Sequence, residues 1–222
     1  MNIEAVIFDL DGTIVKTEQI IWDIWFELGE KHNIEIKKEM LEKVTGSDPH
    51  KEQQIVQDYP EFFILADLVS ETFVNRLNDM KENGGDVSIA GLYDLMDYFQ
   101  QREIPMAIAS NSDKEHVTKL VSMLKNNHLF EIVMTRDDVT IGKPNPEMFL
   151  KVADFFQVEP EKVLVIEDSK FGIKAAKTAQ MRRILIRTMM PISEETKQET
   201  EYICDSLLEV IDVLENRKTV IE

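Results

Sequence analysis

Short apolar segments recur along the chain and are separated by longer amphipathic segments. The first, Ile3 to Phe8, is apolar at most positions and rich in Ile and Val, which is typical of a strand buried on both faces of a parallel sheet. Similar segments follow at Pro105 to Ala109, Glu131 to Met134, Val163 to Ile166 and Arg183 to Ile186. This alternation of strand-like and helix-like segments predicts an α/β fold.

The segments between these strands carry apolar residues at helical spacing. Gly91 to Gln101 and Glu115 to Leu124 each present one apolar face, and Asp113 stands where it would cap the second helix. The pattern recurs at Phe149 to Phe156 and after Ser169. Helices on both faces of a parallel sheet predict a Rossmann-like three-layer core.

A different kind of segment lies between the first strand and Gly91. Residues 17 to 83 contain several helical patterns and no convincing strand, and Gly84 and Gly85 form a natural hinge on the return side. We therefore expect two domains: an α/β catalytic core from residues 1–15 and 85–222, and an inserted all-helical domain from residues 16–84.

Composition narrows the classes of partner. The chain of 222 residues carries a formal charge of −17, which repels nucleic-acid backbones and anionic membrane surfaces. A single cysteine excludes a disulfide framework within the chain and suits a reducing compartment. With no signal-peptide pattern and no apolar stretch of membrane-spanning length, we expect a cytoplasmic protein that binds neither nucleic acid nor membrane.

Candidate chemistry lies where the predicted strands end. Asp9 and Asp11 follow the first strand, Ser110 follows the second, and Glu167 and Asp168 follow the fourth. Each group alone fits a turn or a helix cap. Together they would meet at the carboxyl edge of the sheet, where such folds bind ligands. Four carboxylates in one crevice require a cation, and an all-oxygen ligand set is typical of Mg²⁺.

A lysine supplies further positive charge. Lys143 lies just before a helix whose start is marked by Pro144 and Pro146, and it would suit a phosphoryl oxygen. Because the whole chain is strongly acidic, binding a phosphate ester requires a local reversal of charge. One divalent ion and one lysine are sufficient for that reversal.

Taken in order and spacing, these segments resemble the four motifs of the haloacid dehalogenase superfamily. The matching segments are DLDGT at 9–13, Ser110 with Asn111, KPNPE at 143–147 and EDS at 167–169. The chain is most similar to the subgroup of β-phosphoglucomutase and phosphoglycolate phosphatase, in which a small helical cap follows the first motif. The resemblance covers essentially the whole chain and implies a Mg²⁺-dependent phosphatase, a phosphoric monoester hydrolase.

The resemblance also implies roles for individual residues. Asp9 would be the nucleophile that forms a phosphoaspartyl intermediate, and Asp11 the general acid and then the general base. The transferring phosphoryl group would be held by Ser110, Asn111 and Lys143.

The same resemblance implies the metal ligands. Asp9 and Asp168 would bind Mg²⁺ through their side chains and Asp11 through its backbone carbonyl. Glu167 would assist in the coordination shell.

Departures from the subgroup favour hydrolysis. Mutases of the β-phosphoglucomutase type carry a histidine where this chain has Ile21, and an arginine where it has Pro49. A phosphohexomutase is therefore the alternative reaction. Dehalogenation is disfavoured, because it uses neither an aspartate at the place of Asp11 nor a metal.

Substrate choice is expected to depend on the cap loop, in which the candidate residues are Gly46, Ser47, His50 and Lys51. The expected partner is a small phosphorylated metabolite such as a sugar phosphate, and the expected assembly is a monomer or a weak homodimer. An alternative of another class is a phosphoacceptor or binding module without hydrolysis, although such receiver-like domains are about half this length and have no cap.

Overall fold

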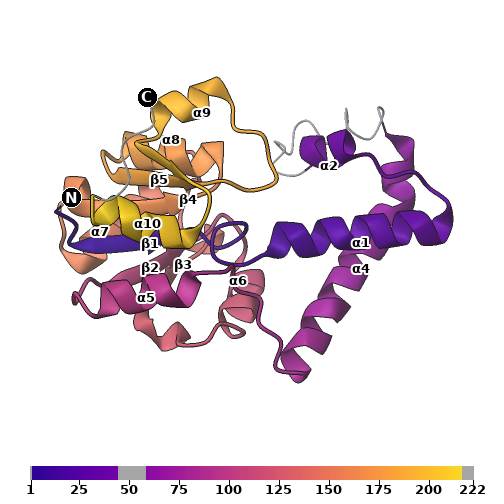
Figure 1. Cartoon of the computed structure of the whole chain (residues 1–222), viewed down its shortest axis with the longest axis horizontal. Coiled ribbons are helices and arrows are strands. Elements are labelled where there is room, and N and C mark those ends of the chain that lie inside the picture. Colours follow the sequence, from indigo (N-terminus) through magenta and orange to yellow (C-terminus); the bar gives the residue numbers. More distant parts are fainter. Residues whose placement is uncertain (1, 45–58, 217–222) are drawn as a thin grey trace. The chain divides into compact units, whose positions relative to one another are not determined.

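The computed structural model describes residues 2–44 and 59–216, and Figure 1 labels most of their helices and strands. The chain divides into two compact units, one formed by Met1–Val15 with Val87–Glu222 and the other by Lys16–Asp86. The second unit therefore interrupts the first once.

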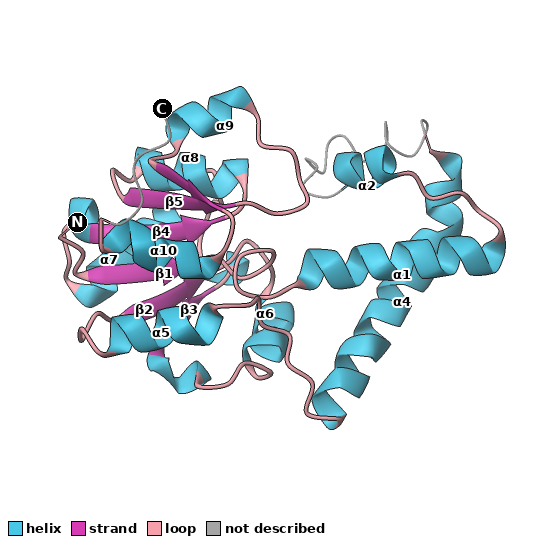
Figure 2. Cartoon of the chain, viewed as in Figure 1, coloured by secondary structure: helices cyan, strands magenta, loops and turns pink. Residues whose placement is uncertain are grey.

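The first unit contains a parallel sheet with a central first strand. Among the described residues the sheet has six strands in the order β3-β2-β1-β4-β5-β6, all paired in parallel (Figure 2). The strands are β1 (Ala5–Phe8), β2 (Met106–Ala109), β3 (Phe130–Met134), β4 (Val163–Glu167), β5 (Arg182–Ile186) and β6 (Tyr202–Cys204). The chain builds outward on one side of β1 and then on the other, so the strand order reverses between β1 and β4. Ligands bind at such a reversal, beyond the carboxyl ends of the strands.

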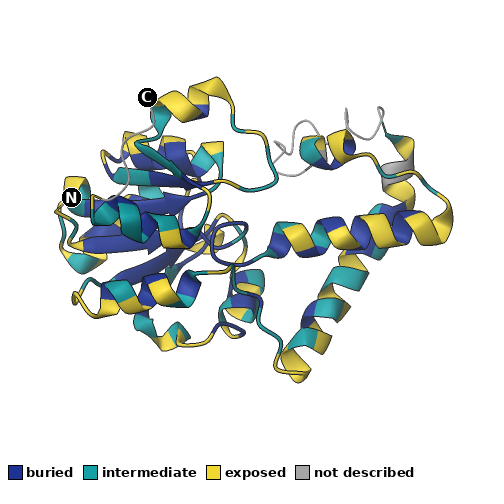
Figure 3. Ribbon diagram, viewed as in Figure 1, coloured by how far each residue is buried: buried dark blue, intermediate teal, exposed yellow. Residues whose placement is uncertain are grey.

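The central strands are buried on both faces, as their continuous apolar sequences predict. Every residue of β1, β2 and β4 is buried, and the strands form a dark block in Figure 3. Val6 of β1 pairs with Met106 on one side and Leu164 on the other. This register brings the carboxyl ends of the three strands to one edge of the sheet.

Helices cover both faces of the sheet. Ala175 of α8 and Phe149 of α7 belong to one apolar cluster with Ile7 of β1. On the opposite face, the ring of Phe99 in α5 meets the ring of Phe8 edge to face, at a centroid distance of 6.0 Å. The helices of this unit are α5 (Leu92–Gln100), α6 (Lys114–Val121), α7 (Glu147–Phe156), α8 (Lys170–Thr178), α9 (Glu194–Glu199) and α10 (Leu207–Leu214). Single 3₁₀ turns form η2 (Asn127–Leu129), η3 (Arg136–Asp138) and η4 (Pro160–Lys162).

Side-chain caps begin two of the helices that flank the strand ends. Asp113 accepts a hydrogen bond from the backbone N–H of His116 and starts α6, as the sequence predicts. Ser169 accepts from the N–H of Gly172 and starts α8. Such caps satisfy N–H groups that have no partner within the helix.

All the secondary-structure elements described in the second unit are helices. Its helices are α1 (Thr17–His32), α2 (Lys38–Val44) and α4 (Pro60–Glu82). Helix α1 packs against α4 through an apolar face that includes Ile24 and Leu28, and α1 ends at Asn33 in the left-handed conformation.

The two points at which the second unit joins the first lie side by side. Val15 forms a bridge with Ser88, and the N–H of Ile89 donates to the carbonyl oxygen of Ile14 at 2.9 Å. Gly12, with φ of +80°, allows the tight turn that leads from β1 to Val15.

The predicted fold class, an α/β core with a parallel sheet and an inserted helical segment, is confirmed. The inserted unit closes at Asp86, whereas the sequence predicts its end at residue 84. The strand β6 is not among the predicted elements. No helix in the described part of the chain is long and apolar enough to cross a membrane.

Candidate active site

Backbone pairing carries two of the predicted site residues to the edge of the sheet. The N–H of Asp9 donates to the carbonyl oxygen of Ile166, and the N–H of Ser110 donates to that of Met134. Each bond extends a strand ladder by one residue beyond β1 or β2. The backbone of Asp9 and Ser110 is therefore fixed, and both residues are buried, at 8% and 2% exposure.

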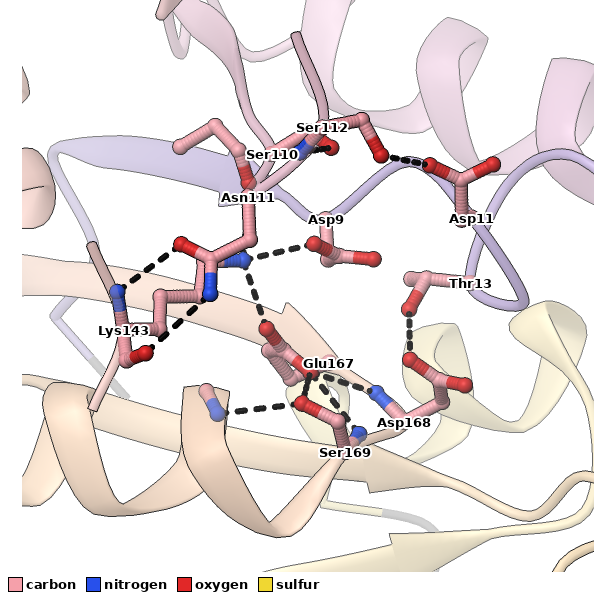
Figure 4. A network of polar contacts seen from close by, with 12 residues as sticks. Asp9, Asp11, Thr13, Ser110, Asn111, Ser112, Lys143, Glu167, Asp168 and Ser169 are labelled. Carbon is pink, nitrogen blue, oxygen red and sulfur yellow. Dashed lines mark hydrogen bonds and ion pairs between the residues drawn. The ribbon is translucent and has the colours of Figure 1, made fainter. Parts of the chain in front are cut away.

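Lys143 lies at the centre of the site. Its Nζ donates to Asp9 Oδ1 at 2.6 Å and to Glu167 Oε1 at 2.7 Å (Figure 4). It also donates to the carbonyl oxygen of Ala109 at 2.8 Å. The ammonium also lies 5.0 Å from the ring centroid of Phe149, over the face of the ring. A lysine 7% exposed is therefore held by charge, hydrogen bonds and an aromatic face.

Glu167 is fully buried and connects Lys143 to the start of α8. While Oε1 accepts from Lys143, Oε2 accepts from the N–H of Asp168 and from both the N–H and the Oγ of Ser169. Gly172 packs so closely on this carboxylate that an added Cβ would overlap it. These bonds stabilise the carboxylate in a place without water contact.

Three acidic side chains form a potential metal site. Asp9, Glu167 and Asp168 each offer one oxygen, and these oxygens lie within 4.8 Å of one another. The Oγ1 of Thr13 donates to Asp168 Oδ1 at 3.1 Å and fixes its orientation. A set of carboxylate oxygens fits a hard divalent cation such as Mg²⁺. Both oxygens of Glu167 already accept hydrogen bonds.

Electrostatics in the site favour additional positive charge. Burial raises the pKa of the Asp9 carboxyl; attraction to Lys143 opposes this rise, while repulsion by Glu167 and Asp11 adds to it. Burial disfavours the ammonium form of Lys143, but attraction to Asp9 and Glu167 outweighs burial and raises the pKa of Lys143. Lys143 therefore stays cationic, and a further cation would help to keep Asp9 ionised.

Asn111 contacts Lys143 in a way that the sequence does not reveal. Its Oδ1 accepts from the N–H of Lys143 at 2.8 Å, and its Nδ2 donates to the carbonyl oxygen of Lys143 at 3.1 Å. An added Cβ at Gly142 would lie only 2.5 Å from Asn111 Oδ1, so a glycine is needed beside this contact. The amide of Asn111, predicted to bind phosphate, thus holds the backbone that carries the lysine.

Asp11 is turned toward α6, and its neighbours there were not predicted as site residues. The Oγ of Ser112 donates to Asp11 Oδ2 at 2.8 Å, and His116 Nε2 lies 2.9 Å from Asp11 Oδ1 (Figure 4 draws the contact with Ser112). The hydrogen bond to Asp11 raises the pKa of His116 against the opposing effect of burial. One signal was available: a helix capped by Asp113 places His116 in its first turn, beside the end of β2.

The predicted specificity loop lies outside the described residues. This applies to Gly46, Ser47, His50 and Lys51, and also to Pro49.

Comparison with known proteins shows to which family the chain belongs. A family model for haloacid dehalogenase-like hydrolases matches residues 6–186, from β1 to β5. The chain belongs to this family. The match spans all four segments from which the resemblance was inferred, so the family prediction is confirmed.

Two relatives in the family are named as phosphatases. A phosphorylated carbohydrates phosphatase of Thermotoga maritima is 28% identical over 184 residues, which are 82% of this chain and 83% of the relative. A fructose-1-phosphate phosphatase of Escherichia coli is 27% identical over 185 residues, which are 83% of this chain and 97% of the relative. The prediction of a phosphoric monoester hydrolase is confirmed at the level of enzyme class.

A solved β-phosphoglucomutase from Clostridium difficile shares the fold. It superposes with a TM-score of 0.67 at 22% identity, over 97% of this chain and 98% of that one.

Proposed function

We propose that this chain is a magnesium-dependent phosphatase that hydrolyses small phosphate monoesters, sugar phosphates or similar metabolites, through a phosphoaspartyl intermediate. The observation that carries the proposal is the buried contact of the Lys143 ammonium with Asp9 and Glu167, next to Asp168. In this proposal Asp9 is the nucleophile, Lys143 is the cation for the phosphoryl oxygens and the three carboxylates supply the metal site.

The charge of the site supports a divalent cation. Among the described residues, the carboxylates of Asp9, Glu167 and Asp168 share this volume with the one ammonium of Lys143, which leaves two negative charges in excess. Mg²⁺ would be held by the side chains of Asp9 and Asp168 and by the backbone carbonyl of Asp11, with Glu167 fixed beside them. When bound, it would keep Asp9 ionised and offset the charge of the phosphoryl oxygens.

The first half of the reaction transfers the phosphoryl group to Asp9. An oxygen of the Asp9 carboxylate attacks phosphorus, the bond between phosphorus and the ester oxygen breaks, and that oxygen takes a proton from the Asp11 carboxyl group. The products are an alcohol and an aspartyl phosphate. Lys143 and the hydroxyl of Ser110 stabilise the charge on the transferring group, which is the main requirement of phosphoryl transfer.

The second half restores the enzyme. A water molecule attacks phosphorus and gives a proton to the Asp11 carboxylate, and the bond between phosphorus and the Asp9 oxygen breaks. Inorganic phosphate leaves, Asp9 is again a carboxylate and Asp11 is again protonated. Asp11 therefore alternates between two protonation states in every turnover.

The substrate class is proposed from the relatives. The names of the two phosphatases refer to phosphorylated carbohydrates and to fructose 1-phosphate. A panel of sugar phosphates, with p-nitrophenyl phosphate as a general substrate, is therefore the first to assay.

We expect release of inorganic phosphate in the presence of Mg²⁺ and its loss with EDTA. Asp9→Asn should lower kcat on the order of a thousandfold or more, because the amide oxygen is a poor nucleophile. Asp154→Asn, a matched change on the exposed surface of α7, should leave turnover unchanged. Retained turnover in Asp9→Asn would exclude the proposed nucleophile.

The same assay separates the alternatives. A stable phosphoprotein that forms without multiple turnovers would favour a phosphoacceptor module. Isomerisation of a hexose phosphate without release of inorganic phosphate would favour the phosphohexomutase.

A further inference from the structure

The carboxylate of Asp11 contacts a hydroxyl group and an imidazole, both on the segment that follows β2. Ser112 Oγ contacts Asp11 Oδ2 at 2.8 Å and His116 Nε2 contacts Asp11 Oδ1 at 2.9 Å, so each carboxylate oxygen has its own partner. All three side chains belong to the first unit and are partly buried, with Asp11 28% and His116 29% exposed.

Ser112 has little freedom to move. Its N–H donates to Ser110 Oγ at 3.1 Å, and its carbonyl oxygen accepts from the N–H of Arg136 at 3.0 Å. The start of α6 is also bonded to η3, since the N–H of Lys114 donates to Asp137 Oδ2 at 2.9 Å. The hydroxyl that contacts Asp11 is thus carried by a fixed backbone.

His116 is fixed in a similar way. Its backbone N–H donates to Asp113 Oδ1 at 2.9 Å, which places it in the first, capped turn of α6. The following residue, Val117, is buried in the core and anchors this turn. The imidazole therefore reaches Asp11 from a position set by the helix start.

The chemistry of the two partners suits an acid that alternates between protonation states. A hydroxyl can donate or accept, and an imidazole can present either a donor or an acceptor nitrogen. Contacts with Asp11 can therefore persist whether its carboxyl group is ionised or protonated.

We propose that Ser112 and His116 are positioning residues that hold the Asp11 carboxyl group in the orientation it needs for proton transfer to the leaving oxygen. This inference rests on the proposed function, in which Asp11 is the general acid. It explains two polar contacts that neither the metal site nor Lys143 requires.

Leaving-group dependence tests the inference. Departure of p-nitrophenolate needs little help from an acid, whereas departure of an alkoxide needs a proton. His116→Asn, whose shorter amide falls short of Asp11, should lower kcat/KM for glycerol 2-phosphate by roughly tenfold or more, and much less for p-nitrophenyl phosphate. Ser112→Ala should act in the same direction.

Two controls separate positioning from damage to the fold. His116→Gln can bring an amide nitrogen close to the place of Nε2 and should restore most of kcat/KM for glycerol 2-phosphate. His128→Gln, at an exposed position in η2, should change neither substrate. The inhibition constant of inorganic phosphate should stay the same in His116→Asn, because Lys143 and Ser110 are untouched.

Two outcomes would overturn the inference. Equal losses for both substrates would indicate a structural role for the two residues, and a rise in turnover of glycerol 2-phosphate would indicate that the contacts restrain Asp11. Failure of the proposed function would appear in the unmodified enzyme itself, as no turnover of either substrate, and would remove the inference with it.

Discussion

Asn111 shows how a single side-chain amide can position a lysine through the lysine's own backbone. Its Oδ1 and Nδ2 bind the backbone N–H and carbonyl of Lys143, while the Lys143 ammonium lies at the other end of that residue, between Asp9 and Glu167. The position of the ammonium therefore depends on the amide. Displacement of a positioning group by about 1 Å can cost about a hundredfold in rate.

We expect Asn111→Ala to lower kcat/KM by roughly tenfold to a hundredfold and to raise the inhibition constant of inorganic phosphate, because Lys143 loses both backbone contacts. Asn111→Asp keeps the acceptor but loses the donor, so it should be impaired as well. Asn127→Ala in η2 is the control. It removes a comparable hydrogen bond, from Asn127 Nδ2 to the carbonyl oxygen of Val121, and should keep full activity. Normal phosphate inhibition in Asn111→Ala would contradict the positioning role.

The meeting of Asp9, Ser110 and Glu167 could be predicted, because each lies at or just after the end of a strand and parallel strands end at one edge of a sheet. The contacts of Ser112 and His116 with Asp11 could not be predicted. Those contacts depend on the direction of side chains from two separate loops, which strand order does not specify. The hydrogen bonds between Asn111 and the Lys143 backbone could not be predicted for the same reason.

At the scale of elements, Glu147 connects the start of α7 to the segment that carries Lys143. Its carboxylate accepts from the backbone N–H of Thr140 and Ile141 and pairs with Lys151. Hydrogen bonds from the backbone of Thr140, then from Lys151 and Ile141, lower the pKa of Glu147 from 4.5 to about 2. The folded chain thus binds this proton less readily than the unfolded chain.

Because the pKa of Glu147 is lower in the folded state, the carboxylate contributes stability above pH 4.5 that is lost as the pH falls toward about 2. We expect Glu147→Gln to lower the urea midpoint of unfolding at neutral pH, and the difference from the unmodified protein to shrink toward about pH 3. Glu161→Gln in η4 removes an exposed carboxylate and serves as the matched control. A difference that stays constant with pH would show that Glu147 acts through packing alone.

The predictable elements were those with a clear hydrophobic pattern. The strands β1 and β2 are entirely apolar, β4 is apolar up to Ile166, and α5 keeps one apolar face from Leu92 to Phe99. The strand β6 has three residues, Tyr202–Cys204, and acquires its structure by pairing with β5. So short a segment has almost no periodicity of its own, and tertiary pairing decides its conformation.

At the scale of the whole molecule, the formal charge of −17 destabilises the folded state, because like charges repel one another when the chain is compact. Salt screens this repulsion, since the Debye length falls from about 30 Å at 0.01 M to about 8 Å at 0.15 M. Salt also weakens surface ion pairs such as Arg187 with Asp205, but exposed pairs of this kind contribute little. Relief of repulsion should therefore dominate.

We expect the thermal unfolding midpoint, measured with EDTA present, to rise as NaCl increases from about 0.01 M to about 0.15 M. Choline chloride at the same ionic strength should give the same rise, because the effect is general screening and involves no specific ion. A midpoint that falls with both salts would show that the ion pairs outweigh the repulsion.

The bridge between Val15 and Ser88, with the bond from Ile89 to Ile14, joins the chain immediately before and after residues 16–86. The two ends of the first unit, on either side of the insertion, are thereby bonded to each other. The inserted residues leave and re-enter the first unit at adjacent positions. An insertion of another length or architecture can enter there without shifting the register of the sheet, because the backbone contacts across the two junctions hold the flanking residues of the first unit together. The segment between these junctions can thus be exchanged while Asp9, Ser110 and Lys143 keep their places in the first unit.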